Sequence, residues 1–128
     1  MADFEYQLDG ELIVVPVYLI GKNGVYDGMF IWDTGSSGII IDHSVASDIG
    51  YSARDGIGFS AVTSAVGKER GYRLVIKEIE VLNKKINDVE VRCHDLKDQG
   101  VKGLIGMSFL KQFKWCLDPK KQIISTAS

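Results

Sequence analysis

The sequence predicts a mostly β fold in which the strands form a closed barrel or a sandwich, with one or two short helices. Three observations support this class. Apolar residues recur mainly at every second position, which is the period of a half-buried strand. Turn-forming residues separate these segments at even intervals, as is typical of barrels and sandwiches. Helix-like segments are few and short.

The first two strands flank a glycine turn. Residues 12–20 are apolar enough to be buried on both faces, and Pro16 within them implies an edge position or a bulge. The glycines and asparagine of 21–24 favour a turn. Residues 25–32 return as a second strand, which leads directly into the polar, glycine-flanked loop 33–38.

A short buried strand and a helix are expected next. Residues 39–41 are three isoleucines, which predict the strand. Residues 42–49 are expected to form the main helix of the first half, with Ser44 as its N-cap and Gly50 at its end. Residues 51–59 contain turn signals and are expected to be irregular.

A long hairpin is predicted in the middle of the chain. Its arms are 59–66 and 72–81, and its turn is expected at 67–71. The apolar positions of the second arm change parity part-way along. Such a change moves side chains to the other face, so we expect a bulge or bend near Lys77 and Glu78.

The last third is expected to contain a turn, a strand, a charged loop, a short helix capped by Ser108 and a final hairpin. In order, these segments are 83–85, 89–93, 96–101, 108–113 and 114–125.

Composition limits the classes of function. The chain has 128 residues, of which 45% are hydrophobic and 25% charged, and we predict a single domain over 1–128. A formal net charge of -2 argues against nucleic acid as a partner. The longest apolar run is far below the roughly 18 residues of a membrane span. The first residues lack the features of a signal peptide, so a cytoplasmic location is the default expectation. The alternative is a domain cut from a larger or membrane-anchored protein.

Cys93 and Cys116 do not predict a disulfide framework, and they are too far apart in sequence for a redox motif. We interpret them as half-buried thiols, while a single disulfide stays open for an oxidising compartment. His94 follows Cys93 within a strand, so the two side chains point to opposite faces. No metal or cofactor is therefore predicted.

Asp33 is the residue with the most chemical significance. A carboxylate at the end of an apolar strand is costly to bury without partners. The loop that follows supplies hydroxyl groups and the backbone N–H groups exposed by Gly35 and Gly38. The loop could thus hold a carboxylate in a fixed orientation in a cleft. The alternative is an ordinary surface turn, since Asp-Thr-Gly also suits turns.

Two segments together resemble the signatures of one enzyme family. Residues 30–37, Phe-Ile-Trp-Asp-Thr-Gly-Ser-Ser, resemble the active-site motif of aspartic proteases. Residues 103–110, Gly-Leu-Ile-Gly-Met-Ser-Phe-Leu, resemble the second signature of that family, which crosses the loop that carries the aspartate. Residues 59–81 match the place of the flap hairpin. The resemblance is strongest to retropepsin-like, single-domain proteases and covers about 10–125, which implies a closed barrel with a flap.

The resemblance implies a homodimeric endopeptidase that cleaves polypeptides. This chemistry uses two carboxylates that share one proton around a water molecule. The chain has a single Asp-Thr-Gly, since Asp9-Gly10 and Asp55-Gly56 lack its hydroxyl residue and are better interpreted as turns. Catalysis therefore requires Asp33 from each of two subunits across a two-fold axis.

The resemblance also implies roles for the neighbouring residues. Thr34 would reach the partner's loop, and Gly35 would let substrate and water approach closely. The Ser36 hydroxyl would hydrogen-bond to the Asp33 carboxylate, favouring its charged form and a more acidic pH optimum. The flap tip would consist of Thr63, Ser64, Ala65, Val66 and Gly67.

Two features of the sequence depart from the pattern of the family. The segment before Leu12 and the final hairpin do not resemble the terminal strands of retroviral dimers, so the mode of dimerisation stays open. Trp32 is bulkier than usual before the aspartate and is expected to pack in the core.

A catalytically silent module that binds peptides or dimerises is the first alternative function. A regulated domain that becomes active only on assembly or autoprocessing is the second.

Overall fold

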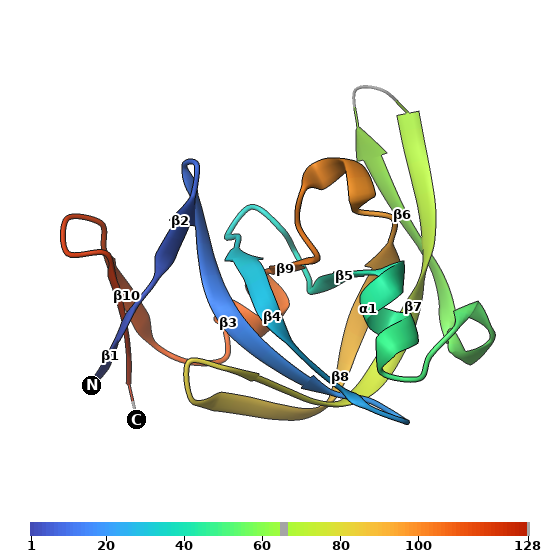
Figure 1. The fold of residues 1–128 in the computed structure, drawn as a ribbon, viewed down its shortest axis with the longest axis horizontal. Coiled ribbons are helices and arrows are strands. Elements are labelled where there is room, and N and C mark those ends of the chain that lie inside the picture. Colours follow the sequence, from blue (N-terminus) through green and yellow to red (C-terminus); the bar gives the residue numbers. More distant parts are fainter. Residues whose placement is uncertain (65–66, 128) are drawn as a thin grey trace.

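A computed structural model describes residues 1–64 and 67–127. It is mostly β, as predicted, with two short α-helices among these residues (Figure 1). The strands are β1 (Ala2–Glu5), β2 (Gln7–Asp9), β3 (Leu12–Ile20), β4 (Val25–Trp32), β5 (Ile40–Asp42), β6 (Gly58–Ser64), β7 (Gly67–Val81), β8 (Lys84–His94), β9 (Gly103–Ile105), β10 (Trp115–Asp118) and β11 (Ile123–Thr126). The helices are α1 (His43–Asp48) and α2 (Met107–Leu110), and single 3-10 turns lie at Ala53–Asp55 and Lys97–Gln99.

Within the described residues, six strands close a barrel in the order β3-β4-β9-β5-β8-β7, and β7 pairs again with β3. Most neighbours are antiparallel, but β4 pairs with β9 and β5 pairs with β8 in parallel. These parallel pairs bring the ends of β4 and β5 beside segments from the last third of the chain. The loop after β4 thus lies next to residues that are about seventy positions away in sequence.

The barrel interior is the hydrophobic core. Its largest fully buried side chains come from most of the barrel strands, from α2, from the residue that ends α1 and from β11: Leu19, Phe30, Ile39, Ile41, Ile49, Leu74, Ile76, Ile79, Ile105, Phe109, Leu110 and Ile124. Trp32 belongs to this core and packs edge-on against Trp115, with ring centroids 5.1 Å apart. Its expected packing role is confirmed.

Pro16 lies at a local gap in the sheet. On one side, β3 pairs with β4 from Val14 to Ile20. On the other side, β2 pairs with residues up to Val14, and β7 pairs from Val17 onward. Pro16 therefore stands between two partners, where its missing N–H disrupts no ladder. This arrangement explains how the proline fits a central strand. The expected edge strand or bulge is not what the structure has, since β3 has neighbours on both sides and its register with β4 runs through Pro16 without a break.

The chain ends form a small separate sheet in the order β1-β11-β10, with both termini at one end of the molecule (Figure 1). The predicted hairpin of β10 and β11 is present. Neither β1 nor β2 was predicted, because both are short and mostly exposed and so lack an alternating pattern. Among the described residues, no helix has the length and apolar character needed to span a bilayer.

Both predicted helices are present, but their predicted N-caps are wrong. Asp42 caps α1 and accepts from the amide of Ser44, which lies inside the helix. Gly106 occupies the N-cap of α2, so Ser108 also lies within its helix. In each case, the helix begins earlier than the cap preference of serine suggested.

The central hairpin has a longer second arm than predicted. Ser64 pairs with Gly67, so 67–71 belong to β7, and the predicted turn there is wrong. The polar run resembled a turn, but arms that project beyond the barrel need no apolar alternation (Figure 1). Further along, the β7–β8 ladder skips Lys77 and Asp88, and Asp88 has a φ of 51°. The bulge or bend expected near Lys77 and Glu78 is therefore a local break in the pairing of β7 with β8. The register of the two strands is the same on both sides of the break.

Candidate active site

Asp33 immediately follows β4 and is half-buried. Its backbone amide donates a 2.9 Å hydrogen bond to the carbonyl of Ile105, which continues the parallel pairing of β4 with β9. The Oδ1 atom of Asp33 accepts a 2.9 Å hydrogen bond from the amide of Gly35. The strand and the loop together thus fix both the backbone and the carboxylate of this residue.

The loop after Asp33 is a tight turn. The amide of Ser36 donates a 3.2 Å bond to the carbonyl of Asp33. Gly35 has little room for a side chain, because a Cβ there would lie 3.1 Å from Asp33 Oδ1. Thr34 and Ser37 are exposed.

Residues 106–108 pack against this loop and bind it by backbone hydrogen bonds. The amides of Met107 and Ser108 donate to the carbonyls of Ser36 and Ser37 at 2.8 and 2.9 Å. Gly106 makes this approach possible, since a Cβ there would lie 2.2 Å from the carbonyl oxygen of Gly38. The second motif therefore crosses the aspartate loop, as the resemblance implied.

The prediction that the Ser36 hydroxyl bonds to the Asp33 carboxylate is wrong. Ser36 Oγ donates a 2.9 Å hydrogen bond to the carbonyl of Gly38 and so closes the loop on itself. The carboxylate of Asp33 is held by the Gly35 amide in its place. The inferred shift toward a more acidic pH optimum, which depended on a bond between Ser36 and Asp33, loses its support.

A mostly apolar groove of about 330 Å³ lies beside Asp33. Its lining comes from separate strands and from the loop between β8 and β9. The lining residues are Leu12, Ile31, Asp33, Ile40, His94, Leu96, Gln99, Val101 and Leu104. The sequence analysis identified only Asp33 among them. Leu96 and Val101 are the two ends of the predicted charged loop, and nothing in the local sequence placed them near the aspartate.

The hairpin expected to act as a flap is anchored next to this groove. Ser60 on β6 lies 2.9 Å from Nε2 of His94, and both residues are buried. His94 also lines the groove, so the base of the hairpin touches its wall. Of the predicted tip residues, Thr63, Ser64 and Gly67 belong to the two strands. Ala65 and Val66 lie outside the described residues.

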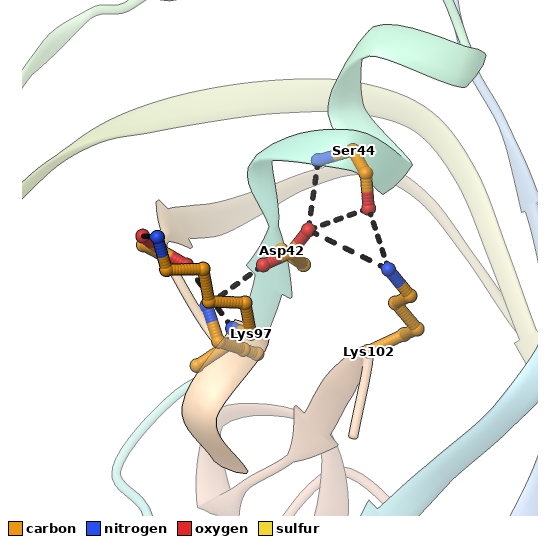
Figure 2. Close-up of polar contacts among 6 residues, drawn as sticks. Asp42, Ser44, Lys97 and Lys102 are labelled. Atoms are coloured by element: carbon orange, nitrogen blue, oxygen red, sulfur yellow. Dashed lines mark hydrogen bonds and ion pairs between the residues drawn. The ribbon is translucent and has the colours of Figure 1, made fainter. Parts of the chain in front are cut away.

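Asp42 is a further polar residue that the sequence analysis did not assign to the site. It is 7% exposed, and its Oδ1 atom accepts a 2.7 Å bond from the amide of Leu96. Its Oδ2 atom accepts from the amide and hydroxyl of Ser44, and Lys102 Nζ lies 3.9 Å away (Figure 2). Burial alone would raise the pKa of Asp42, but these hydrogen bonds and the Lys102 charge outweigh it and lower the pKa.

The thiols do not form a reactive pair. Both are free, with Cys93 buried and Cys116 exposed. Burial raises the pKa of Cys93 to about 12, despite a hydrogen bond from Tyr72, and burial also raises the pKa of Tyr72 to about 12. In the part of the chain that the structure describes, no group of three or more His, Cys, Asp or Glu side chains is placed to hold a metal ion.

The family follows from a comparison with family models. The model described as "gag-polyprotein putative aspartyl protease" matches residues 20–112, which include both motifs. The chain belongs to this aspartyl protease family. A comparison with curated proteins gave no match.

The aspartyl protease fold is also found by structural comparison. The chain is similar to a crystal structure of a retropepsin-like aspartic protease from Rickettsia conorii, with a TM-score of 0.74 and 17% sequence identity. The similarity covers 97% of this chain and 98% of that chain. The retropepsin-like barrel that the resemblance implied is therefore confirmed for this member of the family.

Proposed function

We propose that this chain is an aspartic endopeptidase that acts as a homodimer, with Asp33 of each protomer in the active site. The observation that carries the proposal is the position of Asp33. It is half-buried, its Oδ1 atom is fixed by the Gly35 amide, and it borders an apolar groove. A scaffold without catalysis has no need to orient a carboxylate at the edge of such a groove.

The need for a second copy follows from the chemistry. Peptide hydrolysis by carboxylates uses two of them, since one must accept a proton while the other donates one. The chain has one Asp-Thr-Gly, so the second carboxylate comes from a partner protomer. A two-fold axis brings a residue close to its own copy, which suits a pair of Asp33 side chains.

The proposed reaction proceeds in two steps. First, one Asp33 takes a proton from the water as the water oxygen bonds to the peptide carbonyl carbon, and the other, protonated, donates to the carbonyl oxygen. The carbon–nitrogen bond then breaks: one hydroxyl of the tetrahedral carbon returns its proton to the carboxyl pair as the C=O bond forms again, and the nitrogen leaves with a proton from the other carboxyl group. The titration belongs to the pair and is not divided between its members.

The neighbouring residues have supporting roles in this proposal. Thr34 is exposed and can contact the partner's loop, and Gly35 leaves space for substrate and water. The hairpin of β6 and β7 would close over an extended peptide and pair with its backbone. Its tip would be Thr63 to Gly67, and its base is already anchored through Ser60 and His94.

Dimerisation would involve the sheet formed by the chain ends. In this sheet, β11 lies in the centre, while β1 and β10 are its two edges. A strand of the partner can pair with either edge by backbone hydrogen bonds. In this mode of dimerisation, the partner adds a strand to the edge of a sheet that already exists. The two chain ends do not have to pair with those of the partner, because β1 and β11 of the same chain pair with each other.

Cleavage of a mixed peptide library tests the proposal. The dimeric protein would be incubated with the library at about pH 4 to 7, which includes the upper pKa of about 4.7 known for such a carboxyl pair, and the products read by mass spectrometry. We expect cleavage by the wild type, none by Asp33→Asn, and wild-type cleavage by Asp27→Asn, an exposed aspartate on β4. If the dimeric wild type cleaves no peptide, the result would favour the peptide-binding module. If the Asp33→Asn variant still cleaves peptides, the result would exclude this mechanism.

A further inference from the structure

The loop between β8 and β9 forms one wall of the groove beside Asp33. Leu96, Gln99 and Val101 of this loop line the groove together with the aspartate. Leu96 is 7% exposed, so its side chain is fixed against the protein. A peptide bound at Asp33 would contact this wall, and the position of the wall would decide which side chains fit.

Asp42 contacts both ends of this loop. At the start, the amide of Leu96 donates a 2.7 Å bond to Asp42 Oδ1. At the end, the amide of Asp42 donates a 2.9 Å bond to the carbonyl of Lys102. Lys102 Nζ also reaches Ser44 Oγ at 3.1 Å and lies 3.9 Å from Asp42 Oδ2 (Figure 2). One buried residue thus fixes where the wall begins and where it ends.

A helix cap alone does not account for this arrangement. Capping α1 uses only Oδ2, which accepts from the amide and hydroxyl of Ser44. Serine or threonine can supply such a cap with one oxygen. The second oxygen of Asp42 bonds to Leu96, which is 54 positions away in sequence. The carboxylate therefore joins the helix start to the groove wall, and it takes two oxygen acceptors to do so.

We propose that Asp42 is a positioning residue that sets the place of the Leu96–Val101 wall and thereby the selectivity of the enzyme for the side chain next to the cleaved bond. This inference rests on the proposed function. The lowered pKa of Asp42 agrees with it, because the charged form is the one that can accept all of these bonds at once.

The variant Asp42→Ser separates the two roles. The serine hydroxyl can cap α1, but it is too short to cap the helix and accept from Leu96 at the same time. Asp48→Ser is the matched control, since Asp48 is an exposed aspartate of the same helix. The probes are two peptides taken from a site that the wild type cleaves, with Leu or Ala before the cleaved bond. Amide hydrogen exchange at Leu96 reports on the wall itself.

We expect Asp42→Ser to reduce the ratio of kcat/KM for the Leu peptide over the Ala peptide by about tenfold, mainly through a higher KM for the Leu peptide. The value of kcat should stay within about twofold, since Asp33 is not touched. Exchange at Leu96 should accelerate by about tenfold or more relative to the rest of the barrel. Asp48→Ser should match the wild type in all three readouts.

The outcomes distinguish this inference from the proposed function. Suppose that the wild type cleaves the peptides, Asp33→Asn does not, and Asp42→Ser keeps the wild-type ratio of kcat/KM for the two peptides. This result would overturn the inference about Asp42 and leave the proposed function standing. Silence from the dimeric wild type would overturn both. If the serine variant does not fold, Asp42→Asn keeps the size and one acceptor oxygen of the side chain. The same fall in the ratio would then support the inference, and an unchanged ratio would overturn it.

Discussion

The backbone amide of Asp33 donates a 2.9 Å hydrogen bond to the carbonyl oxygen of Ile105. The bond extends the parallel pair in which Trp32 lies opposite Ile105. The loop that carries the carboxylate therefore begins at a point set by a segment far away in sequence. Any change that moves 103–108 is expected to move Asp33 as well.

Gly106→Ala tests this dependence. The added Cβ would lie 2.2 Å from the carbonyl oxygen of Gly38 and 2.6 Å from that of Ser36. Since both atoms belong to backbone that cannot rotate away, we expect a loss of about 1–3 kcal/mol in the free energy of unfolding, measured by urea denaturation. We also expect peptide cleavage to fall by more than tenfold, as about 1 Å of misplacement can cost that much.

Gly38→Ala provides the control for this substitution. A Cβ at Gly38 meets its nearest neighbour, Ser108 Oγ, at 3.8 Å, which is an ordinary contact. Its free energy of unfolding should stay within about 0.5 kcal/mol of the wild type. An equal loss of stability in both variants would contradict the close approach of Gly106 to the aspartate loop.

The stability of the protein should depend on pH through Asp42. Burial opposes the charge on this residue, but its hydrogen bonds and Lys102 lower its pKa in the folded state. A lowered folded-state pKa adds stability above the unfolded-state value of about 4, and this contribution disappears as the pH falls through the folded-state pKa. We therefore expect Asp42→Asn to lose about 1–3 kcal/mol at pH 7 and less at about pH 3.

Urea denaturation of both proteins at the two pH values measures this effect. Asp48→Asn, which alters an exposed aspartate of the same helix, should stay within about 0.5 kcal/mol of the wild type at pH 7. A difference between wild type and Asp42→Asn that is the same at neutral and acidic pH would contradict the assigned role of the charge.

The two thiols should differ in reactivity. Cys116 is exposed on β10, whereas Cys93 is fully buried and burial raises its pKa to about 12. Since the thiolate is the reactive form, iodoacetamide at about pH 8 should modify Cys116 alone in the folded protein. Mass spectrometry after digestion locates the label. Labelling in urea, where both should react, is the control, and rapid labelling of Cys93 without denaturant would contradict its burial.

Local patterns in the sequence were sufficient to predict much of the fold. The alternation in 25–32 and the turn before it predicted β4, and the polar loop after β4 drew attention to Asp33. The resemblance of residues 103–110 to the second signature of the family indicated a second segment, and the structure places it against the aspartate loop. These features depend on neighbouring residues, so they are visible in the sequence alone.

Other features depend on contacts that no local pattern records. Strand β1 exists because Ala2 pairs with Thr126 at the other end of the chain. The cap of α1 is Asp42 and not Ser44, and Asp42 is held by an amide in the β8–β9 loop. The groove beside Asp33 likewise combines residues from several separate segments. Tertiary pairing decides each of these, and periodicity carries no signal for it.

The activity of mixed dimers tests the central claim most directly. Wild type and Asp33→Asn would be mixed under conditions that let protomers exchange, and peptide cleavage measured at constant total protein. If each active site needs Asp33 from both protomers, activity falls with the square of the wild-type fraction, to about one quarter in an equal mixture. A fall to only about three quarters, expected if one Asp33 is enough for the shared site, or to about one half, expected if the protomers act independently, would contradict the shared carboxyl pair.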